Sequence, residues 1–296
     1  MIILCDFSQM VISSVAANPK DINGDNPKNM IKHIAFNQIL SLKKRFGGKM
    51  ILCCDSREYW RKKEFEWYKG HRKHNRAATG LDWEMVYETL NELKQEIAEN
   101  FPYMVLEING AEADDIIATL AKYFSTNELT TVGLVEEPDI ITIGSTDKDF
   151  QQLQKYKNVQ QWNNVMKKLV KCKNPKEFLI EHIISGDTGD NVPNVCTGDD
   201  WAKCRAENIP TRANSLMTTR IKDFHKKEIE ACINETERRN YKRNELLVNL
   251  DLVPSHISDI ILKTYKDYEI KGSKGKVFKY LNEHRMKLLL SSYNEF

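Results

Sequence analysis

Short apolar runs alternate with longer amphipathic patterns through the first half of the chain, and this alternation limits the folds that the chain can adopt. The apolar runs lie at residues 2–5, 50–54, 103–108 and 140–143 and have the length of buried strands. Between them, segments 27–46, 82–100 and 112–124 repeat apolar side chains at helical spacing. Strands and helices in alternation predict an α/β fold with a mostly parallel central sheet flanked by helices.

The strand pattern ends near residue 174, and the rest of the chain is predicted to be helical. Asn174 followed by Pro175 is typical of an N-cap and a first helical residue. Further helices are expected near 220–247, 256–268 and 276–291. We therefore divide the chain into an α/β domain at 1–183 and a helical C-terminal domain at 184–296. No internal repeat is visible, which excludes a solenoid.

The composition is that of a soluble globular protein. The 296 residues are 41% hydrophobic and 29% charged, with 13 Gly and 8 Pro, which excludes collagen and disordered tails. Asp6 interrupts the apolar N-terminal run, so we expect neither a signal peptide nor a membrane span, and a cytoplasmic location. The seven cysteines include no Cys-x-x-Cys pair and are expected to be reduced thiols. No zinc site is expected, because His71 and His74 lie in a basic run.

Residues 57–76 are basic in an almost neutral protein. The chain carries a formal net charge of +2, whereas this window holds eight basic and three acidic residues, a net charge of +5. The aromatic residues in the window are Tyr59, Trp60, Trp67 and Tyr68. This mixture suits a nucleic-acid backbone with bases that stack on aromatic rings. It also fits a solvated amphipathic helix whose aromatic side chains pack in the core, and the pattern alone leaves both interpretations open.

Acidic residues follow each of the four predicted strands. A parallel sheet brings the carboxyl ends of its strands to one edge, where sites are usually found. The acids in these positions, together with a pair that opens the helical region, are Asp6, Asp55, Glu112, Asp114, Asp115, Asp147, Asp149, Asp187 and Asp190. A single aspartate is usually an N-cap or a solvated turn residue. Nine carboxylates at one edge, however, repel one another unless cations neutralise them.

The donor atoms predict the metal and the chemistry. Carboxylate oxygens with no histidine or cysteine nearby favour two Mg²⁺ ions, with Mn²⁺ as a substitute, over zinc. No EF-hand loop is present. Two such ions, about 3.5–4 Å apart, activate a water and stabilise the leaving oxygen of a phosphodiester. A carboxylate metal site beside a basic segment therefore predicts hydrolysis of nucleic acid.

Six blocks of sequence carry a family resemblance. They are Cys-Asp-Phe-Ser at 5–8, Cys-Asp at 54–55 with Tyr-Trp-Arg-Lys at 59–62, Tyr-Lys-Gly-His-Arg at 68–72, Glu-Ala-Asp-Asp-Ile-Ile-Ala at 112–118, Ser-Thr-Asp-Lys-Asp-Phe-Gln-Gln-Leu at 145–153 and Gly-Asp-Thr-Gly-Asp-Asn-Val-Pro at 186–193. In order, they resemble the flap endonuclease or 5′-nuclease family, and its bacteriophage ribonuclease H branch is similar over essentially the whole chain. The resemblance implies a PIN-like core with a basic arch around 57–80. It also implies a Mg²⁺-dependent, structure-specific 5′ to 3′ exonuclease and flap endonuclease that removes RNA primers and adjoining DNA during lagging-strand processing.

The resemblance further implies roles for individual residues. The residues that correspond to ligands of a first metal ion are Asp6, Asp55, Glu112, Asp114 and Asp147. The residues that correspond to ligands of a second metal ion are Asp149, Asp187 and Asp190. Asp115 corresponds to an acid just outside these two groups. Lys69 and Arg72 correspond to arch residues that contact the scissile phosphate. The other expected nucleic-acid contacts are Arg61, Lys62, Lys63, Tyr68, Lys73, Arg76, Lys203 and Arg205.

Two segments depart from the family pattern. The family carries a glycine-rich hairpin after its last acidic block, whereas residues 195–200 hold one glycine and two acids, so a nest for potassium or phosphate is not expected. Residues 128–139 lengthen the connection before the fourth strand, and we assign them no function.

Two alternative functions remain open. A PIN-like endoribonuclease uses a similar acid cluster but usually lacks the arch and the helical C-terminal part. A replication accessory protein with decayed catalysis normally lacks ligands, and none is missing here. The family resemblance further implies a monomer that acts on branched, nicked or RNA-primed duplex DNA, beside a single-strand DNA-binding protein and a sliding clamp.

Overall fold

A six-stranded sheet forms the centre of the computed structural model, which describes residues 1–17, 22, 26–126, 129–132 and 135–296. In spatial order the strands are β3 (Met104–Glu107), β2 (Lys49–Cys54), β1 (Ile2–Asp6), β6 (Ile141–Gly144), β7 (Val159–Asn163) and β8 (Lys168–Val170). The first five run parallel, and β8 pairs antiparallel with β7. The predicted mostly parallel α/β fold is confirmed.

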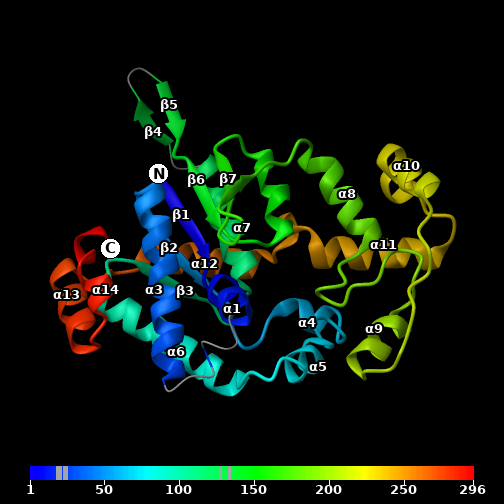
Figure 1. Cartoon of the computed structure of the whole chain (residues 1–296). Helices are drawn as coiled ribbons and strands as arrows, with labels where there is room; N and C mark the ends of the chain where they lie inside the picture. Colours follow the sequence, from blue (N-terminus) through cyan, green and yellow to red (C-terminus); the bar gives the residue numbers. More distant parts are fainter. Residues whose placement is uncertain (18–21, 23–25, 127–128, 133–134) are drawn as a thin grey trace.

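Both faces of the sheet are buried under helices. Successive side chains of a strand point to opposite faces, so alternate residues belong to different cores. Ile3 and Cys5 of β1 belong to one apolar core, while Ile2 and Leu4 belong to a second. The first core lies under α1 (Phe7–Ala17), α3 (Pro27–Phe46) and α6 (Trp83–Asn100), and the second under α7 (Ala113–Thr126) and α12 (Ser255–Asp267) (Figure 1).

The major helices begin where their capping residues predict. The side chains of Asn26 and Asp82 accept backbone hydrogen bonds at the starts of α3 and α6, and Asn174 does so for α8 (Pro175–Ser185). Helix α3 ends at Gly47, whose φ of 64° favours glycine. The pattern did not predict α1, β7 or β8.

The C-terminal part is helical, as predicted, but two expected helices are interrupted. After the 3₁₀ turn η1 (Lys148–Lys155) and α8 come α9 (Asp199–Ala206), α10 (Thr218–Lys227), η2 (Glu228–Ala231), α11 (Glu235–Val248), η3 (Leu250–Leu252), α12, α13 (Lys274–Glu283), α14 (Lys287–Leu290) and η4 (Tyr293–Glu295). The prediction of one helix over 220–247 is wrong, because Glu228 has a φ of 49° and ends α10. Arg285, with a φ of 54°, likewise separates α13 from α14.

The C-terminal helices pack against the α/β part. Helix α12 lies on α7, and α13 lies on α6. The Phe296 ring is buried, with its centroid 6.2 Å from that of Phe36 and 5.4 Å from that of Phe101. A third core joins α8, α10 and α11 to Phe65 and Tyr68, which lie between α4 (Trp60–Glu64) and α5 (Arg72–Ala77). The basic segment is therefore anchored from both halves of the chain.

The extended connection before β6 contains a separate hairpin. Strands β4 (Leu129–Val132) and β5 (Val135–Pro138) pair antiparallel, while residues 127–128 and 133–134 lie outside the described residues. Within the described part of the chain, no helix is both long and apolar enough to span a bilayer.

Candidate nuclease site

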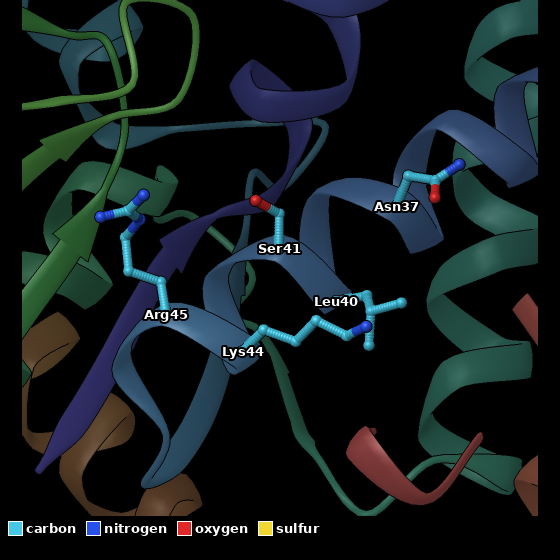
Figure 2. Close-up of a pocket in the computed structure, with 5 residues that line it drawn as sticks. All are labelled: Asn37, Leu40, Ser41, Lys44 and Arg45. Atoms are coloured by element: carbon cyan, nitrogen blue, oxygen red, sulfur yellow. The ribbon is translucent and has the colours of Figure 1, made fainter. Parts of the chain in front are cut away.

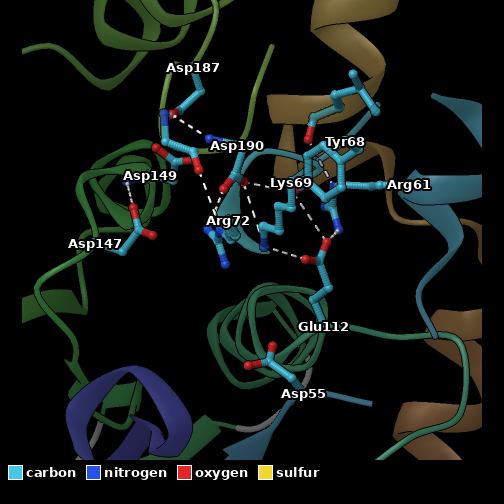
Figure 3. Close-up of polar contacts among 12 residues, drawn as sticks. Asp55, Arg61, Tyr68, Lys69, Arg72, Glu112, Asp147, Asp149, Asp187 and Asp190 are labelled. Carbon is cyan, nitrogen blue, oxygen red and sulfur yellow. Dashed lines mark hydrogen bonds and ion pairs between the residues drawn. The ribbon is translucent and has the colours of Figure 1, made fainter. Parts of the chain in front are cut away.

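Carboxylates from separate segments meet at the carboxyl ends of the parallel strands (Figure 3). Asp6 ends β1, Asp55 follows β2, and Asp147 lies three residues after β6; β1 pairs with both β2 and β6. Asp114 lies in the first turn of α7. Burial raises the pKa of Asp6, and the charges of Asp55 and Asp147 raise it further. Burial followed by repulsion from Asp147 likewise raises the pKa of Asp114. The carboxylates of the first predicted ligand group are thus close enough to raise one another's pKa values.

Backbone and hydroxyl donors hold these acids in place. The Ser145 hydroxyl donates to Asp6 Oδ2 over 3.1 Å, and the amide of Ala113 donates to Asp55 Oδ1 over 2.9 Å. Asp147 caps η1, where its Oδ1 accepts from the Asp149 amide over 2.9 Å. Each carboxylate is therefore oriented before any ligand binds.

A second acidic group lies in a turn beside the first. Asp187 Oδ1 accepts from the amides of Gly189 at 2.6 Å and Asp190 at 3.1 Å, so this pair lies in a turn and not on a helix. Lys148 Nζ lies 3.0 Å from Asp187 Oδ2. Arg205 Nη1 donates to the carbonyl of Thr188 over 2.8 Å and braces the same turn.

A histidine that the sequence did not indicate lies in this second group. His182 Nε2, on α8, is 2.9 Å from Asp149 Oδ1 and 3.6 Å from Asp187 Oδ2. The expectation of no histidine near the acids is wrong, because α8 packs on η1 and brings together residues far apart in the chain. Burial alone favours the neutral imidazole, but the carboxylate of Asp149 outweighs it and raises the pKa of His182.

The two arch cations contact the acids directly. Lys69 forms an ion pair with Glu112 and lies 3.6 Å from Asp190, and Arg72 Nη2 is 2.5 Å from Asp190 Oδ1. Lys69 has a φ of 56°, and its amide donates to the Asp190 carbonyl over 2.8 Å. Burial opposes ionisation of Asp190, but Lys69 and Arg72 lower its pKa to about 2.

Arg61 and Tyr68 are buried in this fold and contact the acids, and their contact with nucleic acid stays a prediction. Arg61 is 1% exposed; its Nη1 lies 2.8 Å from both Glu112 Oε2 and Asp115 Oδ1, and its Nε donates to a carbonyl of α11. Tyr68 is 3% exposed and donates to Asp190 Oδ2 over 2.8 Å. Trp60 is also buried and donates to Asp115 Oδ2. These side chains therefore hold the acids in place.

Replacing Arg61 is expected to destabilise the protein strongly. Arg61→Met leaves the buried carboxylate of Asp115 without its cation, and breaking a buried ion pair from one side costs about 3–5 kcal/mol. Urea denaturation measures the change in the free energy of unfolding. The exposed neighbour Lys62→Met is the control, with an expected change within about 0.5 kcal/mol. A loss below about 1 kcal/mol for Arg61→Met would show that the pair contributes little.

The other expected nucleic-acid contacts remain accessible. Lys62, Lys63, Lys73 and Lys203 are exposed, while Arg72, Arg76 and Arg205 are partly exposed. A cavity of about 840 Å³ joins the arch to the acids, and Asp55, Lys69, Arg72, Arg76, Trp83 and Tyr87 are among its lining residues. A separate hollow over α3, lined by Asn37, Leu40, Ser41, Lys44 and Arg45, contains none of the acids (Figure 2).

Residues 195–198 form a turn that leads into α9, and residues 199–200 are its first two residues. Gly198 is the N-cap residue, and Asp199 forms ion pairs with Arg239 and Arg243 of α11. Asp199 is thus engaged within the protein, and the absence of a potassium or phosphate nest stays a prediction.

Divalent cations are expected to stabilise the protein, and more at high pH. The pKa of Asp6 and of Asp147 is raised from 3.8 by burial and neighbouring carboxylates, to about 8 and about 7. The folded state therefore holds these protons more tightly, and the stability they supply is lost as pH rises from about 4 to 8. Scanning fluorimetry should show a metal-free melting temperature that falls over this range. Saturating Mg²⁺ should raise it by about 5–10 °C at pH 8, and less at pH 5. A melting temperature indifferent to Mg²⁺ would contradict metal occupancy.

Comparison with known proteins identifies the family. The model for the 5′-3′ exonuclease N-terminal resolvase-like domain matches residues 2–182, and that for the T4 RNase H C-terminal domain matches residues 175–296. Ribonuclease H of Enterobacteria phage T4 is 32% identical, across 100% of this chain and 95% of that protein. Flap endonuclease Xni of Shewanella woodyi is 30% identical over 148 residues, 46% of this chain and 49% of that protein.

Solved structures share the fold. A bacteriophage T5 flap endonuclease in a pseudo-enzyme-product complex with DNA and metal ions has a TM-score of 0.64 and 17% identity, and the match covers 90% of this chain and 98% of that one. The resemblance inferred from the six sequence blocks, including that to the bacteriophage ribonuclease H branch, is confirmed. The chain belongs to the 5′-3′ exonuclease family, with the C-terminal domain of the T4 ribonuclease H type.

Proposed function

We propose that this family member is a Mg²⁺-dependent, structure-specific 5′ to 3′ nuclease that acts as exonuclease and flap endonuclease. Its substrates are RNA primers and the adjoining DNA of lagging-strand fragments. The observation that carries the proposal is the meeting of two carboxylate groups with the cations Lys69 and Arg72 at one edge of the sheet. The clustered carboxylates need metal cations to offset their mutual repulsion, and the Lys69 and Arg72 side chains beside them suit a phosphate group.

The residues fit a pair of hard divalent ions. Asp6, Asp55, Glu112, Asp114 and Asp147 form the first proposed ligand group, and Asp149, Asp187 and Asp190 the second. Burial and mutual repulsion raise the pKa values of Asp6, Asp114 and Asp147, which indicates a pocket short of positive charge. Bound Mg²⁺ supplies Lewis-acid activation of water and stabilises charge on the reacting phosphate.

The chain's own residues bind and orient the substrate. Lys69 is partly buried against Glu112 and Asp190 and presents a fixed positive charge beside the acids. Arg72 lies closer to solvent, with 40% of its side chain exposed. Both cations are placed to bind the scissile phosphate and to stabilise the charge that develops on it. Asp115 forms an ion pair with Arg61 and also holds Glu112 in place. The backbone amide of Glu112 donates to Asp115 Oδ2 over 2.9 Å.

Nucleic acid is proposed to follow the cavity and the exposed basic residues. Lys62, Lys73 and Arg76 line the cavity and suit a single strand that leaves the site. Residues 184–296, with Lys203 and Arg205, are proposed to bind the duplex. A protein with the same fold that was solved with DNA and metal ions supports nucleic-acid binding by this chain.

The cellular setting is proposed from the relative. Similarity to T4 ribonuclease H along the whole chain supports a monomer that works in the host cytoplasm on branched, nicked or RNA-primed duplexes. A single-strand DNA-binding protein and a sliding clamp are the proposed partners. Sedimentation of the purified chain alone and with each partner tests both points.

Cleavage of matched substrates tests the activity. We expect Mg²⁺-dependent products from 5′-flap, nicked and RNA-primed duplexes that share one sequence, with cuts near the junction or at the 5′ end. A linear single strand and a blunt duplex are the controls. Cleavage within single-stranded RNA, without dependence on a junction, would favour a PIN-like endoribonuclease. Binding without cleavage would favour a decayed accessory protein.

A further inference from the structure

His182 gives the second acidic group a nitrogen donor that the first group lacks. One ligand atom from each of Asp149, His182 and Asp187 lies within 4.8 Å of the other two. The donors come from η1, α8 and the turn that follows α8, so three segments converge. The first group offers carboxylates from the end of β1, the loops after β2 and β6, and the start of α7. The two groups therefore differ in chemical character.

The histidine is buried, and its Nε2 has no hydrogen-bond partner among the described residues. Its side chain is 4% exposed, and Nε2 lies at ion-pair distance from Asp149 Oδ1. The relative orientation is not that of a hydrogen bond, and among the described residues neither atom has a hydrogen-bond partner. The ring of Phe178 stacks on His182, with centroids 5.8 Å apart and planes 26° apart, and so fixes the imidazole plane. Buried polar atoms that point into one space without satisfying each other indicate a missing ligand.

We propose that His182 Nε2 binds the second metal ion together with Asp149 and Asp187, and that it gives this position a preference for Mn²⁺ over Mg²⁺. The inference rests on the proposed two-metal nuclease and deepens it. Mg²⁺ binds oxygen donors almost exclusively, whereas imidazole nitrogen suits first-row transition metals. The carboxylate position is thus the magnesium-like one, and the position at His182 accepts a softer ion.

The local charge agrees with a divalent ion at this position. Asp149 and Asp187 together neutralise two positive charges, and a neutral imidazole adds a donor without adding negative charge. Lys148 Nζ, 3.0 Å from Asp187 Oδ2, already offsets part of the carboxylate charge. A third carboxylate in place of His182 would increase repulsion inside a buried site, whereas the imidazole completes it without that cost.

Pulsed electron paramagnetic resonance of the full chain with Mn²⁺ tests the proposal directly. Nuclear modulation from ¹⁴N is expected in the wild type, and growth on ¹⁵N-histidine should replace it with the ¹⁵N pattern. His182→Gln should abolish the modulation, whereas His256→Gln, at an exposed histidine on α12, should keep it. In Mn²⁺ titrations followed by the free-ion signal, His182→Gln should weaken one of two sites by at least about tenfold. Mg²⁺ affinity should change by less than about threefold.

The outcomes separate this inference from the proposed function. Mg²⁺-dependent cleavage by a wild type without histidine modulation overturns the role of His182 and leaves the nuclease proposal intact. Modulation that persists in His182→Gln also overturns it, because another histidine is then the ligand. Failure of the wild type to cleave any junction substrate overturns the proposed function itself. The wild-type isotope experiment requires no variant, so a folding defect in His182→Gln cannot decide the result.

Discussion

Asp147→Asn and Asp187→Asn are each expected to lower Mg²⁺-dependent cleavage of a 5′-labelled flap by at least about 10³-fold. Each substitution removes one negative charge from one of the two proposed metal groups and keeps the size of the side chain. Asp147 is coupled to Asp6 and Asp114 through their charges, and Asp187 lies beside Asp149 and His182. Single-turnover cleavage with saturating enzyme measures the chemical step separately from binding.

The matched control is Asp267→Asn, at an exposed carboxylate on α12, which should cleave at the wild-type rate. Binding of the flap, measured in Ca²⁺ by fluorescence anisotropy, should change little in either active-site variant, because the basic residues are retained. Removal of a repelling carboxylate should leave the melting temperature unchanged or raise it. Wild-type cleavage by both active-site variants would reject the assignment of these acids as metal ligands.

Lys69→Met has the second largest expected effect, a fall of about 10²–10³-fold in the single-turnover rate. The lysine supplies a fixed charge beside the acids, and methionine keeps its apolar stem. The variant is expected to fold, because Glu112 keeps Arg61 and Asp190 keeps Arg72 as partners. Rate constants at saturating enzyme, compared with affinities from anisotropy, separate a chemical role from a binding role.

Lys62→Met provides the matched comparison within the same arch. Lys62 is exposed and lines the cavity, so its loss should weaken binding and reduce the salt dependence of affinity while the rate at saturation is kept. If Lys69→Met behaves like Lys62→Met, Lys69 serves only to attract the strand. A fall in the saturated rate for Lys69→Met alone supports stabilisation of the reacting phosphate.

The sheet and the first acidic group could be predicted because they depend on local patterns and on one topological rule. Apolar runs marked β1, β2, β3 and β6, and periodic segments marked α3, α6 and α8, which begin after Asn26, Asp82 and Asn174. Asp6, Asp55 and Asp147 follow parallel strands, and parallel strands end at one edge. The strand β8 was missed because it has only three residues, two of them exposed and the third partly buried, so it lacks an apolar pattern.

The sequence by itself determined the fold class, the family and the identity of the acids, because strand periodicity, capping and ordered motifs are encoded locally. Only the tertiary structure decided which basic and aromatic side chains are exposed to solvent and which are buried. Arg61 and Tyr68 look like surface residues in a basic run, yet burial against Glu112, Asp115 and Asp190 makes them supports for the site. His182 lies beside Asp149 because α8 packs on η1, a contact between segments that are separate in the sequence. The physical reason is that burial and charge pairing depend on contacts between distant segments, which no local pattern encodes.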